Sequence, residues 1–287
     1  MTAPKAGCCN AVMAPAIQSL KNFLEQTDSL VVLSGAGVST GSGIPDYRDR
    51  NGDWKHSQPI QYGEFMGSEQ ARRRYWARSY IGWRRFSGAK PNRAHHALAR
   101  LEDAGKVDTV ITQNVDRLHS AAGHQNVIDL HGDLSKVRCM NCAAITGRDD
   151  FQVALERANP GWTAEAKHFR ADGDAELVDD AEAGFAVPDC DSCGGIQKPD
   201  VVMFGENVPK ERVEHAMSAV ERADALLVVG SSLMVFSGFR FARRAGELDK
   251  PVAIVNKGRT RADDIAGLKL EEDCSRVLPD AVDSVLA

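Results

Sequence analysis

Two pairs of cysteines constrain the fold of this chain more than any other feature. Each pair has the spacing C-x-x-C: Cys139 with Cys142, and Cys190 with Cys193. Two thiolates three residues apart on a tight turn can hold one metal ion, and two such turns supply the four sulfurs of a complete zinc shell. A four-sulfur shell leaves no position for water or substrate, so this zinc is expected to stabilise structure and not to catalyse.

Composition and charge argue against several classes of protein. The 287 residues carry a formal net charge of -5, which disfavours binding to a phosphate backbone and therefore a DNA-binding zinc ribbon. No apolar run reaches membrane-spanning length. The chain has seven cysteines, and the C-x-x-C spacing of four of them favours a reducing compartment with zinc over disulfides. Residues 1–16 predict neither a signal peptide nor a transit peptide, and Cys8 and Cys9 are expected to lie in a disordered tail.

Apolar runs and helical stretches alternate along most of the chain. The runs are short, rich in β-branched residues and bounded by polar or turn residues, which is typical of buried strands. Continuous apolar strands alternating with helices predict an α/β fold with a doubly wound parallel sheet. The predicted strands are 29–34, 108–112, 225–229 and 252–255, and the clearest predicted helices are 94–104, 210–223 and 239–247.

Two segments interrupt this alternation. Residues 47–90 contain a helical, aromatic and basic core at 72–86. Residues 139–193 are rich in Ala, Asp and Gly, show few strand signals and are bracketed by the two cysteine turns. Both are expected to be excursions from the sheet and not separate sequential domains.

A glycine-rich turn follows the first predicted strand, with Gly35, Gly37, Gly41 and Gly43. Glycines after a strand let the backbone approach a pyrophosphate. The fit to G-x-G-x-x-G is imperfect because Thr40 occupies the third glycine position, so a flexible turn without a ligand remains open. Pro45 discourages the helix that usually follows in a dinucleotide-binding unit.

Polar side chains follow two further predicted strands. Gln113, Asn114 and Asp116 come directly after 108–112, at the carboxyl edge where open α/β sheets bind ligands. Helix capping by Asn114 or Asp116 is the alternative explanation. His131 also ends a predicted strand, where a neutral imidazole could act as a general base.

Several motifs occur together in one order: Gly35-Ala-Gly37, Gly43-Ile-Pro-Asp-Tyr-Arg48, Thr112-Gln-Asn-Val-Asp116, Leu130-His-Gly132, the two C-x-x-C pairs, Lys198-Pro-Asp-Val-Val-Met-Phe-Gly-Glu206 and Gly230-Ser-Ser-Leu233. In order and context they resemble the sirtuins, and the resemblance covers the chain from about Ala16 to its end. The long interval 143–189 between the cysteine pairs, with Trp76 and Trp83, resembles class II sirtuins, the group that contains mitochondrial sirtuin four. Without a transit peptide, the chain is expected to be a bacterial cytoplasmic member.

The resemblance implies NAD-dependent removal of an acyl group from lysine. Nicotinamide would leave, and the acyl group would pass to ADP-ribose. It also implies a large Rossmann-like NAD-binding domain made of residues 16–46, 91–138 and 198–287. Residues 47–90, a helical and cofactor-loop module, and 139–197, the zinc module, would form the small domain.

The resemblance also implies a function for individual residues. Asn114 and Asp116 would place the nicotinamide and its ribose, Gln113 would bond the ribose hydroxyls, and His131 would be the general base. An extended substrate peptide would pair with the backbone of Val202, Phe204 and Gly205. Asn256 would lie on the adenosine ribose and Cys274 near the adenine. The remaining expected NAD contacts are Gly35, Ala36, Gly37, Asp46, Tyr47, Arg48, Gly230, Ser231 and Ser232.

The preferred acyl group stays open. Tyr75 and Arg78 resemble a Tyr-x-x-Arg pair that binds succinyl-lysine in another sirtuin class, and a guanidinium would suit an acidic acyl group. Tyr75 lies about one helical turn further from Pro91 than in that class, so an exposed helix face is the alternative. The interval between the cysteine pairs is a second candidate to shape the acyl channel. Lipoyl, biotinyl, hydroxymethylglutaryl and acetyl groups all remain.

Two alternative functions stand beside deacylation. Mono-ADP-ribosyltransfer uses the same cleavage of NAD but needs no acyl channel. A non-catalytic NAD sensor would not need a base such as His131. The expected partners are acyl-lysine proteins or peptides, with no nucleic acid and no membrane, and a monomer is favoured.

Overall fold

The computed structural model describes residues 15–178 and 181–287. The tail with Cys8 and Cys9, and the expectation of no targeting peptide, lie outside the described residues. Within them, no helix is both long enough and apolar enough to cross a membrane.

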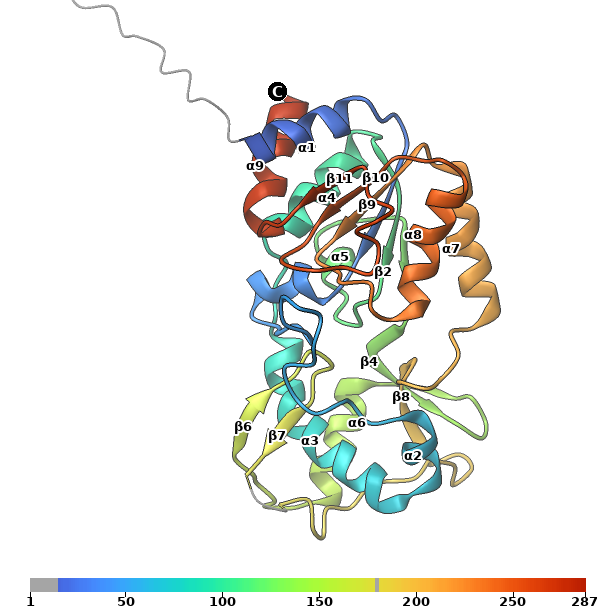
Figure 1. Cartoon of the computed structure of the whole chain (residues 1–287). Helices are drawn as coiled ribbons and strands as arrows, with labels where there is room; N and C mark the ends of the chain where they lie inside the picture. Colours follow the sequence, from blue (N-terminus) through green and yellow to red (C-terminus); the bar gives the residue numbers. More distant parts are fainter. Residues whose placement is uncertain (1–14, 179–180) are drawn as a thin grey trace, which may run out of the picture.

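A six-stranded parallel sheet forms the larger part of the molecule (Figure 1). Its strand order is β11-β10-β9-β1-β2-β3, and all five residues of the central strand β1 are buried. The sheet is the predicted doubly wound one, and all four predicted strands belong to it. The strands are β1 (Leu30–Ser34), β2 (Val107–Thr112), β3 (Val127–Asp129), β9 (Ala225–Val229), β10 (Val252–Val255) and β11 (Leu268–Leu270).

Helices cover both faces of the sheet because alternate strand side chains point to opposite faces. Leu30 and Val32 pack with α1 (Pro15–Glu25), α4 (Arg93–Asp103) and α9 (Cys274–Leu286). Val31 and Leu33 pack with α7 (Lys210–Arg222) and α8 (Phe236–Glu247). The predicted helices correspond to α4, α7 and α8, and α8 begins three residues earlier than expected.

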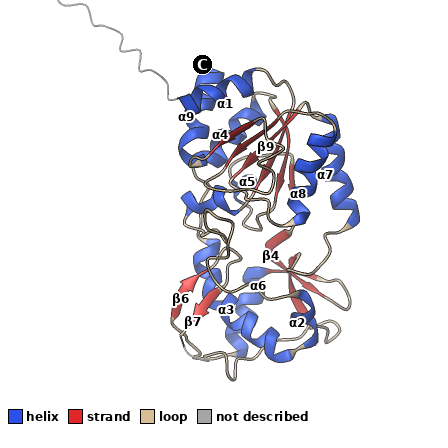
Figure 2. Ribbon diagram, viewed as in Figure 1, coloured by secondary structure: helices blue, strands red, loops and turns tan. Residues whose placement is uncertain are grey.

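The smaller part lies beyond the carboxyl ends of these strands, below the sheet in Figure 2. It contains a three-stranded antiparallel sheet with the order β5-β4-β8 and a separate hairpin of β6 and β7. The sequence showed few strand signals here, because three of these strands have only three or four residues. The elements are α2 (Tyr62–Gly67), α3 (Glu69–Ser87), β4 (Gly132–Cys139), β5 (Ile145–Gly147), α6 (Arg148–Ala158), β6 (Ala166–Phe169), β7 (Ala175–Leu177) and β8 (Gln197–Val201).

One aromatic core joins two segments of this part that are distant in sequence. Trp76 of α3 is fully buried, and its ring centroid lies 4.6 Å from that of Phe151 in α6. The Trp76 Nε1–H donates to the carbonyl oxygen of Gln197, 3.1 Å away. Tyr80 of α3 packs in the same way against Trp162 and Phe185. The interval 143–189 is therefore a folded element that shares its core with α3.

Candidate functional site

A cavity of about 380 Å³ lies between the carboxyl edge of the large sheet and the smaller part. Its volume is within the range of small-molecule sites. Neither Arg78 nor Cys274 lines it. The other residues that the sequence singled out for NAD or substrate do line it: Gly35, Ala36, Gly37, Asp46, Tyr47, Arg48, Tyr75, Gln113, Asn114, Asp116, His131, Val202, Phe204, Gly205, Gly230, Ser231, Ser232 and Asn256.

Gln113 connects the ends of several strands. Its backbone N–H donates to the carbonyl oxygen of Ser34 at the end of β1, at 3.0 Å. Its side-chain Nε2 donates to the same oxygen at 3.2 Å and to Ser231 Oγ, after β9, at 2.7 Å. Its own carbonyl oxygen accepts the Nδ1–H of His131, after β3, at 2.9 Å. One residue therefore fixes the relative positions of four strand ends.

Asn114 and Asp116 meet at a serine that the sequence analysis did not assign. Ser39 Oγ donates to Asp116 Oδ2 at 2.7 Å and accepts from Asn114 Nδ2 at 3.0 Å. Asp116 Oδ1 accepts the N–H of Leu118, the first residue of the short helix α5 (Leu118–Ala121). The N-cap of α5 is Arg117, without a side-chain cap hydrogen bond, so neither Asn114 nor Asp116 caps this helix. Burial raises the pKa of Asp116.

A buried network of polar side chains holds the Asn114–Asp116 loop in place. The Asn114 backbone N–H donates to Thr112 Oγ1 at 3.1 Å, and Thr112 Oγ1 lies 2.9 Å from Ser34 Oγ. Ser34 Oγ in turn lies 2.8 Å from Nε2 of His119, whose side chain is buried. Burial holds the pKa of His119 well below its usual value, so this histidine is neutral.

His131 has the geometry of a neutral base. A backbone carbonyl only accepts, so the contact with Gln113 places the proton on Nδ1 and leaves Nε2 as the acceptor. Ser237 Oγ, at the start of α8, donates to Nε2 at 2.9 Å. Burial lowers the pKa of His131 to about 4, and the positive charges of Arg212 and Arg240 act in the same direction. Ser237 carried no motif signal in the sequence.

The glycine turn packs backbone against backbone. The Gly37 N–H donates to the carbonyl oxygen of Gly230 at 2.8 Å, and a Cβ on Gly37 would lie 2.8 Å from that oxygen. The turn continues as the 3-10 helix η1 (Ala36–Ser42), and no regular α-helix follows Pro45 directly. The glycines therefore allow the ends of β1 and β9 to lie in contact at the cavity.

The segment 202–206 also lines the cavity. The Val202 N–H donates to the carbonyl oxygen of His131 at 2.7 Å, and the carbonyl oxygen of Phe204 accepts the N–H of Tyr62 at 2.8 Å. Glu206 holds the segment from inside, because its Oε2 lies 3.0 Å from Lys198 Nζ and accepts the Met203 N–H at 2.9 Å. Lys198 and Glu206 are the two ends of a sequence motif that did not predict this contact.

Arg78 is held outside the cavity. Its Nη2 lies 3.0 Å from Asp174 Oδ2, and its Nε donates to Asp174 Oδ1 at 3.1 Å. Tyr75, by contrast, is 6% exposed and lines the cavity. The interval between the cysteine pairs supplies Ala171 and Asp172 to the same wall, so this interval reaches the cavity. Burial raises the pKa of Asp172.

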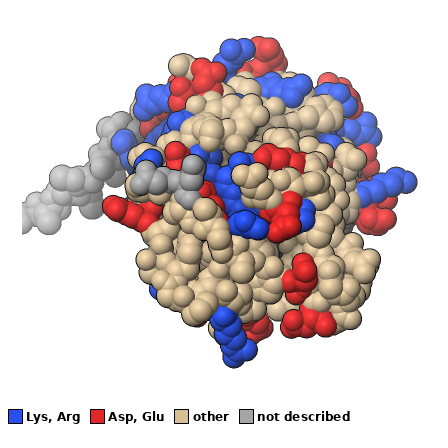
Figure 3. Space-filling view, turned by 90° about the horizontal axis from the view of Figure 1, so that it is seen from below, with Lys and Arg blue, Asp and Glu red and all other residues tan. Residues whose placement is uncertain are grey.

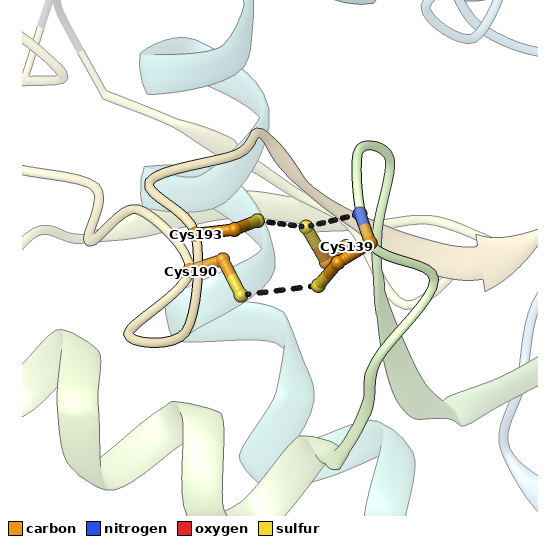
Figure 4. A group of neighbouring side chains, drawn as sticks. Cys139, Cys190 and Cys193 are labelled. Carbon is orange, nitrogen blue, oxygen red and sulfur yellow. Dashed lines mark hydrogen bonds between the residues drawn. The ribbon is translucent and has the colours of Figure 1, made fainter.

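The four cysteines of the two C-x-x-C pairs form one cluster (Figure 4). Their sulfurs all lie within 4.8 Å of one another, with Cys139 Sγ 3.5 Å from Cys193 Sγ and Cys142 Sγ 3.8 Å from Cys190 Sγ. Zn–S bonds of about 2.3 Å in a tetrahedron require sulfurs about 3.8 Å apart, so the cluster fits one zinc ion. None of the four lines the cavity, which fits a structural zinc.

Cys274 lies apart from both sites. It is buried at the start of α9, and its Sγ contacts the carbonyl oxygen of Gly37 at 3.6 Å. Cys274 therefore packs against the glycine turn. Its expected place near the adenine stays a prediction.

Gly195 provides a test of the metal site. A Cβ at this position would lie 2.8 Å from Cys139 Sγ and 2.6 Å from the Cβ of Asn141. We expect the chain to contain one zinc, and Gly195→Ala to lower zinc affinity roughly 10–100-fold. Metal analysis and thermal unfolding in a competing chelator measure this. Gly63→Ala is the matched control, because a Cβ there meets no atom within 4 Å. Equal zinc retention in both variants would contradict the assignment.

The state of His131 can be measured by itself. With its pKa at about 4, the ring is expected to remain neutral from pH 8 down to pH 5.5. An NMR titration of the ring, assigned with His131→Ala, measures this. A midpoint near the ordinary histidine value of about 6.5 would mean that the cavity does not lower the pKa of this ring.

Comparisons with known proteins show the family of this chain. The Sir2 family description matches residues 35–237. A protein of Bradyrhizobium diazoefficiens named NAD-dependent protein deacetylase 2 is 57% identical over 261 residues, 91% of this chain and 96% of that protein. The Drosophila melanogaster NAD-dependent protein deacylase Sirt4 is 44% identical over 270 residues, 93% of this chain and 86% of that protein.

Solved structures show the same fold. A Sir2 protein with a p53 peptide and NAD+ has a TM-score of 0.76 and 32% identity, and the match covers 93% of this chain and 98% of that one. A second Sir2 enzyme structure has a TM-score of 0.74 at 31% identity, covering 96% and 99%. The family match spans more than half of the chain, and close relatives align over nearly all of it. This chain belongs to the Sir2 family.

Proposed function

We propose that the protein removes acyl groups from lysine side chains and transfers them to ADP-ribose from NAD, with release of nicotinamide. The observation that carries this proposal is the neutral imidazole of His131. His131 lines the cavity together with Asn114, Asp116 and the segment 202–206, and its Nε2 accepts from Ser237 Oγ. The names of the relatives, as deacetylases and a deacylase, support the same activity.

The residues that line the cavity fit NAD. Gly35, Ala36 and Gly37 present backbone after β1, and Ser231 and Ser232 present hydroxyls after β9. Asn256 is 8% exposed, and its amide makes only local contacts of 3.3 and 3.4 Å with nearby carbonyl oxygens, so it is available to a ribose. When bound, NAD supplies an electrophilic ribose carbon whose leaving group is nicotinamide.

The side chains of the cavity then have separate tasks. Asn114 and Asp116, held by Ser39, place the nicotinamide and its ribose in the cavity. The backbone of Val202, Phe204 and Gly205 pairs with an extended peptide, so that acyl-lysine enters beside His131. His131 Nε2 accepts a proton from a ribose hydroxyl, and the Gln113 carbonyl oxygen keeps the ring in the required tautomer. Holding the reacting groups in line supplies much of the rate.

The four clustered thiols favour a reducing compartment, which supports action on acylated proteins in the bacterial cytoplasm.

Mono-ADP-ribosyltransfer and NAD sensing are the remaining alternatives. Neither function needs an acyl channel, whereas here Tyr75, Ala171 and Asp172 of the smaller part add to the cavity wall. A sensor also has no use for a base with a lowered pKa.

An acyl-lysine panel tests the function. One peptide sequence carrying free, acetyl-, lipoyl-, biotinyl-, hydroxymethylglutaryl- or succinyl-lysine is incubated with NAD, and nicotinamide release is measured. We expect release only with acylated peptides. His131→Ala is expected to lower kcat at least about 100-fold and to change the Kd for NAD only slightly. A kcat of this variant close to that of the unchanged protein, or equal release with free lysine, would contradict the mechanism.

Arg78→Ala tests the acyl pocket separately. Arg78 is paired with Asp174, and burial raises the pKa of Asp174 to about 8. We therefore expect this variant to lower stability by about 1–3 kcal/mol, as loss of one partner of a buried hydrogen bond does. The ratio of succinyl to acetyl rates should stay unchanged. A selective loss of the succinyl rate would show instead that Arg78 leaves Asp174 and binds the acyl carboxylate.

A further inference from the structure

An exposed aromatic ring surrounded by arginines lies at the edge of the cavity. Phe236, the first residue of α8, is 44% exposed. The guanidinium carbons of Arg240, Arg243 and Arg261 lie 5.2, 5.5 and 5.7 Å from its ring centroid. Arg261 also lies 4.5 Å from the ring centroid of Phe239. We call these five residues the Phe236 patch.

The positive charge of the Phe236 patch is largely uncompensated. Arg243 has a carboxylate partner, Glu247, at 3.3 Å. Within residues 15–178 and 181–287, Arg240 and Arg261 have no carboxylate oxygen within 4.0 Å. Arg240 Nε is buried and lacks a hydrogen-bond partner there. In a chain whose net charge is -5, three neighbouring guanidinium groups are a local concentration that favours an anion.

The patch is continuous with the site. Phe236 and Arg240 line the same cavity as Val202 and Phe204. Ser237, the next residue after Phe236, holds Nε2 of His131. In the view from the small end of the molecule, acidic and basic side chains lie interspersed (Figure 3). A peptide whose lysine reached His131 would therefore have its neighbouring residues close to the Phe236 patch.

We propose that the Phe236 patch binds an acidic side chain of the substrate protein, within a few residues of the acyl-lysine. This inference rests on the proposed function and adds a substrate class to it. Residues of an extended peptide are spaced about 3.3 Å apart, so side chains two to four positions from the lysine lie roughly 7–13 Å along the chain from it. A carboxylate there pairs with Arg240 and Arg261, while its methylene groups pack on Phe236. A free anion would gain nothing from the exposed ring.

Matched peptides test this proposal. Two acetyl-lysine peptides differ only in having Glu or Gln at the positions two to four residues on either side of the lysine. We expect kcat/KM to be about three- to tenfold higher for the Glu peptide in low salt. The ratio should fall towards one in 0.5 M salt, because Arg261 is exposed and Arg240 only partly buried, so salt screens their charges. Equal kcat/KM values in low salt would overturn the proposal.

Two double variants locate the effect. Arg240→Gln with Arg261→Gln is expected to bring the ratio close to one. Arg93→Gln with Arg222→Gln removes the same charge from α4 and α7, where both side chains are exposed, and should retain the ratio. The ratio compares kcat/KM for two peptides on the same variant. A change in the chemical step that affects both peptides equally therefore cancels. A ratio that survives in the first variant would overturn the assignment to this patch.

Peptide binding separates this proposal from the proposed function. Fluorescence anisotropy with the same two peptides, labelled, gives their Kd values without turnover. If neither peptide is deacylated but the Glu peptide binds more tightly, the proposed function fails and the patch stands. If both are deacylated and bind equally, the function stands and the patch proposal fails.

Discussion

The hydrogen bonds of Gln113 set the geometry on which the rest of the site depends. Its backbone and side chain both donate to the Ser34 carbonyl oxygen, its amide also holds Ser231, and its carbonyl oxygen holds His131. Parallel strands bring these segments to one edge, but their relative positions depend on these bonds. The same contact with His131 fixes the tautomer that makes Nε2 an acceptor. Fold and proton chemistry therefore meet at one residue.

The smaller part of the molecule supplies further residues to the wall of the cavity. Its aromatic core ties α3 to the interval between the cysteine pairs, and the four-cysteine cluster closes the base of that interval. The interval in turn places Ala171 and Asp172 in the cavity wall and Asp174 against Arg78. Zinc would thus affect the chemistry only through folding, because Ala171, Asp172 and Asp174 belong to the segment that the cysteines bracket.

Much of this architecture was predictable from local sequence. Buried parallel strands such as 225–229 are continuous apolar runs, and the C-x-x-C turns are local chelates. Ser39, Ser237 and the partner of Arg78 were not predictable. Each acts through a residue distant in sequence: Ser39 through Asp116, Ser237 through His131, and Arg78 through Asp174. Arg78, a candidate for the acyl pocket, shows why. The sequence around an arginine on a helix does not indicate which carboxylate its guanidinium will contact.

The stoichiometry of the reaction tests the central claim most directly. With NAD and an acyl-lysine peptide, mass spectrometry and chromatography can count each product in a single time course. We predict equal amounts of nicotinamide, free lysine peptide and O-acyl-ADP-ribose throughout. Nicotinamide formed with ADP-ribose attached to the peptide, or in the absence of any acyl transfer, would contradict the account.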